Sequence, residues 1–146
     1  MTNTLRWADS IRAGQPITAP FADVPVACND PHDVAAVAAA ALTAPDSGED
    51  VVHRISGPRA LLPAEQVDVV AATLGIPIAF EPQDDATARA EMESQMPEEY
   101  VDAFFELFVE GRVDETTVHP TVERVTGTPP RSFEQWAEAH VEAFRG

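Results

Sequence analysis

The residues best suited to bind a ligand are two methionines and three phenylalanines in the second half of the chain. They are Met92, Met96, Phe104, Phe105 and Phe108. Methionine side chains adapt to irregular surfaces and phenyl rings supply apolar area, so such a set can line a pocket for a small apolar or aromatic ligand. Side chains of the same kinds also form ordinary cores. The sequence therefore predicts an apolar pocket here, with core packing as the alternative.

Carboxylates are abundant around this apolar set, and they are the next candidates for chemistry. Adjacent or near-adjacent acids occur at 84–85, 91–93 and 98–99. A pair of carboxylates does acid–base work only when the two groups face each other across a pocket. Acids that are neighbours on a polar helix face are normally solvated. The sequence therefore does not specify a catalytic acid or base.

Metal binding and thiol chemistry are not predicted either. Asp30, His32 and Asp33 could hold a cation, but both acids are explained by the start of a helix, where acidic side chains are favoured. The histidines lack the spacing of a His-Glu-x-x-His metal helix; they are His32, His53, His119 and His140. We expect His53 to have a structural or surface role. Cys28 is the single cysteine, and with no basic neighbour in the sequence to activate it we expect an inert thiol.

The charge balance excludes several classes of partner. The chain of 146 residues has a formal net charge of −16 and a pI near 4.3. Nucleic-acid phosphates and anionic membrane surfaces both require cationic protein surfaces. No apolar run approaches the roughly 20 residues that cross a bilayer, and the N-terminus has no signal-peptide pattern. We expect an acidic, cytoplasmic protein that binds neither nucleic acid nor membrane.

The basic residues exclude some enzyme classes as well. All nine are arginine, and the chain contains no lysine. This excludes a Schiff-base lysine, a Walker phosphate loop and the Tyr-x-x-x-Lys pair of ordinary short-chain dehydrogenases.

The elements that must position these residues are clearest between 51 and 80. Val51, Val52 and Ile55 favour a short strand that ends at Gly57. A helix is predicted from Pro63 to a left-handed cap at Gly75, and residues 76–80 favour a second strand.

The rest of the chain is predicted to be mainly helical, with short strands. Helices are expected at 5–13, after Asp30, at 84–94, from Pro97 to Gly111, and after a Ser132–Gln135 capping box. Residues 17–19 and 24–27 are expected to form short strands of a small sheet, because prolines interrupt them. The predicted fold class is α/β with short mixed strands.

Four segments, in this order, resemble one known family. The first is Asn3–Gly14, and the second is 29–37, which contains an Asp-x-x-Asp-Val-Ala motif. The third is the strand with Gly57-Pro58 and the later Leu74-Gly75-Ile76-Pro77-Ile78, and the fourth is the closing segment 126–136, which begins Thr-Gly-Thr-Pro-Pro and contains Phe133. Together they are similar to the C-terminal half of NmrA-like proteins, which are atypical short-chain dehydrogenase/reductases that bind NAD(P). The resemblance implies one domain over residues 1–146, the distal part of a Rossmann-like fold with a helical substrate-side lobe. It also implies that Asn3 and Trp7 flank a substrate pocket with the methionines and phenylalanines named above, although aromatic packing is the simpler role for Trp7.

The cofactor motif of that family is not found. It is a Gly-x-x-Gly-x-x-Gly turn, and the glycines of this chain lack that spacing; they are at 14, 48, 57, 75, 111, 127 and 146. NAD(P) is therefore implied by the resemblance alone, and we expect no cofactor-binding residues in this chain. The leading interpretation is the substrate-side portion of an NAD(P)-dependent oxidoreductase. The alternatives are a stand-alone module that binds a small ligand or a protein, and a cofactor-independent isomerase or cyclase.

The resemblance also suggests a partner. The family's sheet has strands that correspond to nothing in this chain, so the 51–56 strand is expected to present an open edge. We therefore expect a homo-oligomer or a separate N-terminal half that completes the sheet; a truncated start at Met1 is the other explanation.

Overall fold

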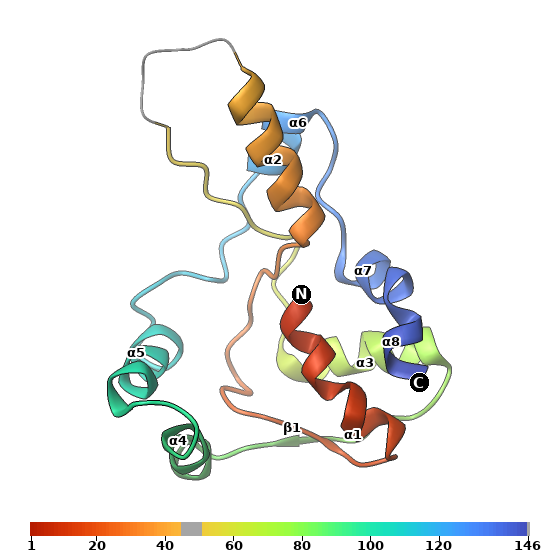
Figure 1. Ribbon diagram of the computed structural model, residues 1–146, viewed down its shortest axis with the longest axis vertical. Coiled ribbons are helices and arrows are strands. Elements are labelled where there is room, and N and C mark those ends of the chain that lie inside the picture. Colours follow the sequence, from red (N-terminus) through yellow and green to blue (C-terminus); the bar gives the residue numbers. More distant parts are fainter. Residues whose placement is uncertain (45–50, 146) are drawn as a thin grey trace.

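A computed structural model describes residues 1–44 and 51–145, and in these residues helices predominate while the small sheet lies along the lower edge of the view in Figure 1. The first half contains the 3₁₀ helix η1 (Thr2–Trp7), α1 (Ala8–Arg12), β1 (Ile17–Ala19), α2 (Pro31–Thr43) and α3 (Pro63–Leu74). The second half contains β2 (Phe80–Pro82), α4 (Asp85–Glu93), α5 (Glu98–Phe108), α6 (Thr121–Thr126), α7 (Phe133–Ala139) and α8 (Val141–Arg145).

The sheet of the described residues joins β1 to β2 in parallel. Ile17 is opposite Phe80, and the Ile17 backbone N–H donates to the Ala79 carbonyl at 2.8 Å. A single antiparallel bridge also links Val26 to Leu61. A parallel pair of short strands and one antiparallel bridge among many helices confirm the predicted α/β class with short mixed strands.

Three helix boundaries agree with the local signals in the sequence. The Asp30 side chain accepts a hydrogen bond from the His32 backbone N–H at 2.9 Å and so caps α2. Gly75 closes α3 with a φ of +69°, which glycine adopts without steric cost. Ser132 and Gln135 form the reciprocal capping box at the start of α7.

Both strand predictions of the 51–80 segment were wrong in detail. The stretch 51–55 carries no strand, because β-prone side chains give a ladder only where a second strand lies alongside. The predicted strand at 76–80 is replaced by β2, which begins only at Phe80. Pro77 and Pro82 cannot donate to a ladder, which helps to confine pairing to a short stretch.

Several helices also differ from the prediction. The first is a 3₁₀ turn that continues into α1, and α5 ends at Phe108, before Gly111. The helix after Ser132 is divided at His140, whose Nδ1 lies 2.8 Å from the Trp136 carbonyl oxygen. The pattern of the 84–94 helix predicts that Ala86 and Ala90 face inward, but in α4 the buried residue is Ala88 and both of these alanines are exposed.

The core lies where the two ends of the chain meet the sheet and α3. Trp136 is fully buried, and Trp7, Ile17, Val67 and Phe144 surround it in one cluster. These residues come from η1, β1, α3, α7 and α8. Trp7 therefore has the packing role that is the simpler one for an aromatic residue.

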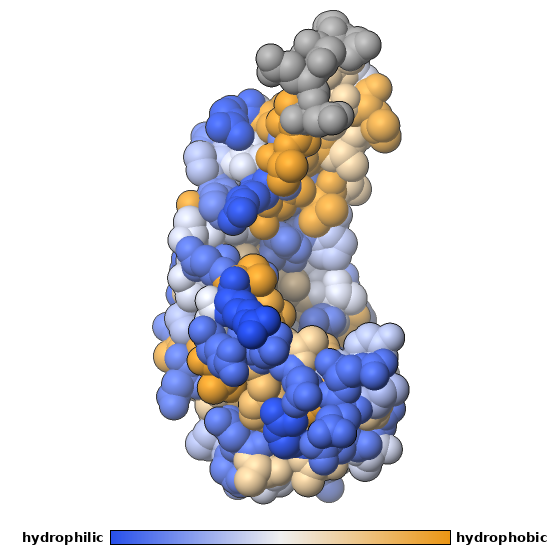
Figure 2. Space-filling view, turned by 90° about the vertical axis from the view of Figure 1, so that its left-hand side faces the viewer, coloured by the Kyte–Doolittle hydropathy of each residue, from blue (hydrophilic) through white to orange (hydrophobic). Residues whose placement is uncertain are grey.

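Helices α4 and α5 form a hairpin that stands apart from this core (Figure 1). The side of the molecule turned toward the viewer in Figure 2 is largely hydrophilic, and hydrophobic residues gather mainly at the end that carries α2. Helix α2 has the exposed apolar side chains Val34 and Leu42, and Val51 and Val52 further along the chain are exposed as well.

Candidate functional site

Phe21 connects the α4–α5 hairpin to the segment that follows β1. Its ring stacks on Phe108, with centroids 5.0 Å apart, and meets the edge of Phe105 at 5.2 Å. Phe104 lies parallel to Phe108 at 6.3 Å. We call Phe21, Phe104, Phe105 and Phe108 the aromatic cluster. Aromatic pairs at these separations stabilise a structure beyond the area that they bury.

The backbone of Phe21 is strained. Its φ is +55°, in the left-handed region, where it is the one residue other than glycine among the described residues. For a bulky side chain this conformation is an outlier that costs about 1–2 kcal/mol. Strain of this kind persists where surrounding contacts hold it and is often found at ligand sites. Here the two ring contacts hold Phe21 in place.

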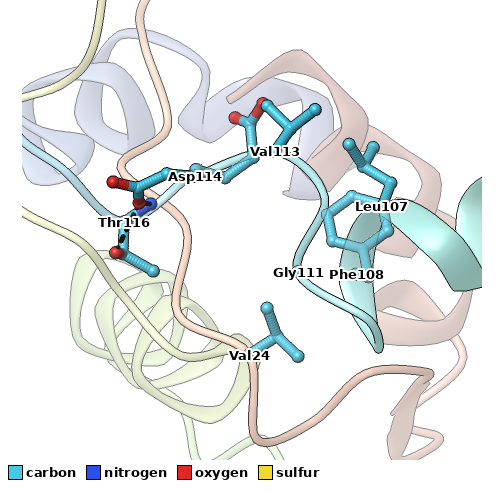
Figure 3. A pocket seen from close by; sticks show the side chains of 8 residues that line it. Val24, Leu107, Phe108, Gly111, Val113, Asp114 and Thr116 are labelled. Carbon is cyan, nitrogen blue, oxygen red and sulfur yellow. Dashed lines mark hydrogen bonds between the residues drawn. The ribbon is translucent and has the colours of Figure 1, made fainter.

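An apolar hollow of about 230 Å³ lies at the end of α5 (Figure 3). Leu107 and Phe108 form one wall, and Val24 of the segment after β1 faces them. Val113 and Asp114, from the loop that follows α5, close the other side. Typical ligand pockets measure about 300–1,000 Å³, so this hollow suits one aromatic ring or a short apolar chain.

The loop at the rim of the apolar hollow is ordered by one carboxylate. Asp114 accepts hydrogen bonds from the hydroxyl and backbone N–H groups of both Thr116 and Thr117. The hydroxyl of Thr117, that of Thr116 and the two backbone N–H groups together hold the pKa of Asp114 well below its ordinary value. Asp114 therefore keeps its negative charge to a lower pH than an ordinary aspartate does.

A second hollow of about 250 Å³ adjoins the first and is more polar. The two share Val113, Asp114 and Glu115. Arg54, Ser56 and His119 add hydrogen-bonding groups to the second hollow, and the His119 backbone N–H donates to Ser56 Oγ at 2.7 Å. A ligand longer than one ring can extend from the apolar hollow into this polar one.

The structure brings together part of the predicted pocket set. Phe104, Phe105 and Phe108 lie in the aromatic cluster, and Phe108 lines the hollow. Met92 is half-buried at the end of α4, and Met96 is half-buried between α4 and α5. Asn3 is exposed on η1 and Trp7 lies in the core, so neither belongs to either hollow.

Sequence reasoning missed Phe21, Val24 and the Asp114 loop. Phe21 lies between the two short strands predicted at 17–19 and 24–27, and Val24 begins the second of them. A short strand interrupted by proline does not show which of its side chains line a site. Asp114 could have been found, because an aspartate two and three residues before threonines is typical of a side-chain-capped turn.

Cys28 and the possible metal ligands are the remaining candidates that the sequence offers for chemistry. Among residues 1–44 and 51–145, no group of three or more His, Cys, Asp or Glu side chains is arranged to hold a metal ion. Burial raises the pKa of the Cys28 thiol, which keeps it protonated and poorly nucleophilic. No helix in the described part of the chain is long and apolar enough to cross a membrane.

Comparison with solved structures identifies the class of fold. The chain superposes on an NADPH-dependent quinone oxidoreductase from Escherichia coli with a TM-score of 0.73 at 19% identity, covering 96% of this chain and 51% of that one. A triphenylmethane reductase from Citrobacter sp., solved with NADP(H), gives 0.70 at 12% identity, covering 92% of this chain and 47% of that one. A nucleoside-diphosphate-sugar epimerase from Staphylococcus aureus gives a TM-score of 0.70 at 16% identity, covering 94% of this chain and 48% of that one. The chain therefore has the distal part of a Rossmann-like fold with a helical lobe.

Curated relatives are reductases. The chain is 40% identical over 145 residues to a (4-alkanoyl-5-oxo-2,5-dihydrofuran-3-yl)methyl phosphate reductase from Streptomyces griseus. It is 36% identical over 146 residues to an NAD(P)H azoreductase from Xenophilus azovorans. Each match covers 99% of this chain and 51% of the relative, so the chain spans about half the length of the curated relatives it matches. No protein-family model matches the sequence.

Proposed function

We propose that this chain forms the substrate-side portion of an NmrA-like, NAD(P)H-dependent reductase, and that its apolar hollow receives an aromatic or apolar substrate. The strained Phe21 is the observation that carries the proposal. It lies two residues beyond the carboxyl end of β1, and ligands of open α/β folds bind beyond the carboxyl ends of parallel strands. The similarity to two reductases along nearly the whole chain supports the same activity class.

Binding of a neutral aromatic probe tests this site. Because one relative is an azoreductase, we choose azobenzene-4-carboxamide and isothermal titration. Phe108→Ala is expected to weaken binding about tenfold, since the ring is part of the wall and of the Phe21 stack. Phe104→Ala is expected to weaken it less, because Phe104 is 40% exposed and does not line the hollow.

Tyr100→Ala is the matched control, since Tyr100 is an exposed aromatic residue on the same helix. It should leave the affinity unchanged. Phe108→Leu keeps apolar volume without the ring and serves if Phe108→Ala does not fold. The proposal would be contradicted if the unmodified chain did not bind the probe, or if Phe108→Ala and Phe108→Leu bound it as tightly as the unmodified chain does.

Cofactor binding and assembly form the second part of the proposal. We expect this chain alone to bind NADPH no tighter than millimolar, because it carries no glycine-rich turn to cradle the phosphates. Val51 and Val52 are exposed, and the described residues pair no strand with 51–55. A second copy or a separate N-terminal half would cover this stretch.

Light scattering followed by titration of the same sample with NADPH tests both expectations. We expect a mass above 15.7 kDa and weak NADPH binding. A 15.7 kDa monomer that binds the probe but not NADPH would favour a stand-alone ligand-binding module. Micromolar NADPH binding would show a cofactor site built from other residues.

A further inference from the structure

We infer that the apolar hollow selects cationic aromatic ligands over anionic ones, a conclusion that rests on the proposed function and names its substrate class. The eight residues that line the hollow include Asp114 and Glu115 and no basic residue. Both acids are exposed and belong to the loop that lines the hollow, and Figure 3 shows Asp114 on the side away from Leu107 and Phe108, with its carboxylate turned toward Thr116. A positively charged group on a bound ring would therefore be attracted by the two acidic residues of the lining, and an anionic group would be repelled.

The aromatic cluster already holds a cation of this kind from within the chain. The guanidinium carbon of Arg89 lies 4.3 Å from the centroid of the Phe105 ring, the geometry of a cation–π contact. The same guanidinium is 2.7 Å from the Asp102 carboxylate. One ring and one carboxylate thus bind a flat cation on one part of the cluster. Phe108, Asp114 and Glu115 bring the same kinds of group, a phenyl ring and carboxylates, to the lining of the hollow.

The surrounding charge has the same sign. Residues 81–117 contain twelve acidic residues and two arginines, a formal charge of −10. Arg89 is paired with Asp102 and Glu93, and Arg112 is paired with Glu106 and Glu110. Asp114 keeps its charge through its four hydrogen-bond donors. The potential at the hollow is therefore negative and attracts cations while it repels anions.

Among the residues that line the two hollows, Arg54 is the arginine that could oppose this preference, and His119 is the other basic side chain. Arg54 lines the adjoining polar hollow and does not line the apolar one. A ligand in the apolar hollow could reach Arg54 with an anionic group only by extending into the polar hollow. That group would then also lie near Asp114 and Glu115, which line both hollows. We therefore assign the charged end of the ligand to the carboxylates.

Three azobenzenes that differ in one substituent test the inference: 4-trimethylammonium, 4-carboxamide and 4-sulfonate. At low salt the cationic probe should bind the intact chain at least tenfold more tightly than the anionic one, with the neutral probe between them. The ratio should shrink toward one at 1 M salt, where exposed charges are screened beyond about 3 Å. Glu115→Gln should lower the low-salt ratio of cationic to anionic probe affinity about threefold, and the ratio is compared within each variant so that a general loss of affinity does not count.

Glu138→Gln is the matched control. It removes one exposed charge from α7, away from the hollow, and should leave the ratio unchanged. Equal affinity for the three probes would overturn the inference. The inference would also be overturned if Glu138→Gln lowered the ratio of cationic to anionic probe affinity as much as Glu115→Gln does. If the sulfonate probe binds more tightly than the cationic probe, and Arg54→Gln removes this difference, the inference is overturned and the polar hollow is assigned to anions. Failure of the neutral probe to bind would contradict the proposed function itself.

Discussion

Gly57→Ala is expected to unfold this protein or to cost about 3 kcal/mol or more, a large part of the ~5–15 kcal/mol that stabilises an ordinary domain. A Cβ atom at position 57 would overlap the carbonyl oxygen of Cys28 and lie 3.1 Å from its carbonyl carbon. Both atoms are backbone, so no side chain can rotate away. The Gly57 N–H also donates to the Ala27 carbonyl at 3.0 Å, which holds the two segments together.

Gly111→Ala is the matched control for this experiment. Gly111 has a φ of +66° but nothing within 4 Å of an added Cβ. Its replacement should cost only the backbone strain, about 1–2 kcal/mol. Urea unfolding followed by circular dichroism measures both variants. A Gly57→Ala protein that is as stable as Gly111→Ala would show that the 27–28 and 57 segments do not pack as the structure has them.

Phe21→Ala is expected to abolish most probe binding and to lower the free energy of unfolding by about 2–3 kcal/mol. This loss in free energy of unfolding is smaller than the loss expected for truncating a fully buried phenylalanine, because Phe21 is only half-buried. The substitution removes the contacts with Phe105 and Phe108 while the backbone strain stays. Without the stack, the end of α5 loses its attachment to the segment after β1.

Phe21→Gly separates the strain from the ring contacts. Glycine adopts a φ of +55° freely, so this variant should be about 1 kcal/mol more stable than Phe21→Ala, although glycine usually destabilises relative to alanine. Both variants should bind azobenzene-4-carboxamide equally poorly. If alanine proves the more stable of the two, Phe21 does not hold a left-handed backbone. If both bind the probe as the unmodified chain does, Phe21 does not support the hollow.

The sequence by itself determined the helices that have local start and stop signals. Asp30 before α2, Pro63 and Gly75 around α3, and Ser132 with Gln135 before α7 all act within one turn of helix. Interactions over three or four residues depend on nothing distant in the chain, so their residue types are sufficient evidence. The same reasoning found Phe104, Phe105 and Phe108, because one helix carries them at helical spacing.

Only the tertiary structure decided what lies opposite those residues. The β1–β2 pair joins Ile17 to Phe80, and the aromatic cluster joins Phe21 to Phe108. Such contacts depend on loop paths and on the strand that happens to lie alongside, which side-chain periodicity does not encode. The same limit explains why the β-prone stretch at 51–55 carries no strand and why Trp7 and Asn3 lie apart from the hollow. Helix signals are local and survive in the sequence, whereas a site between segments exists only once the chain has packed.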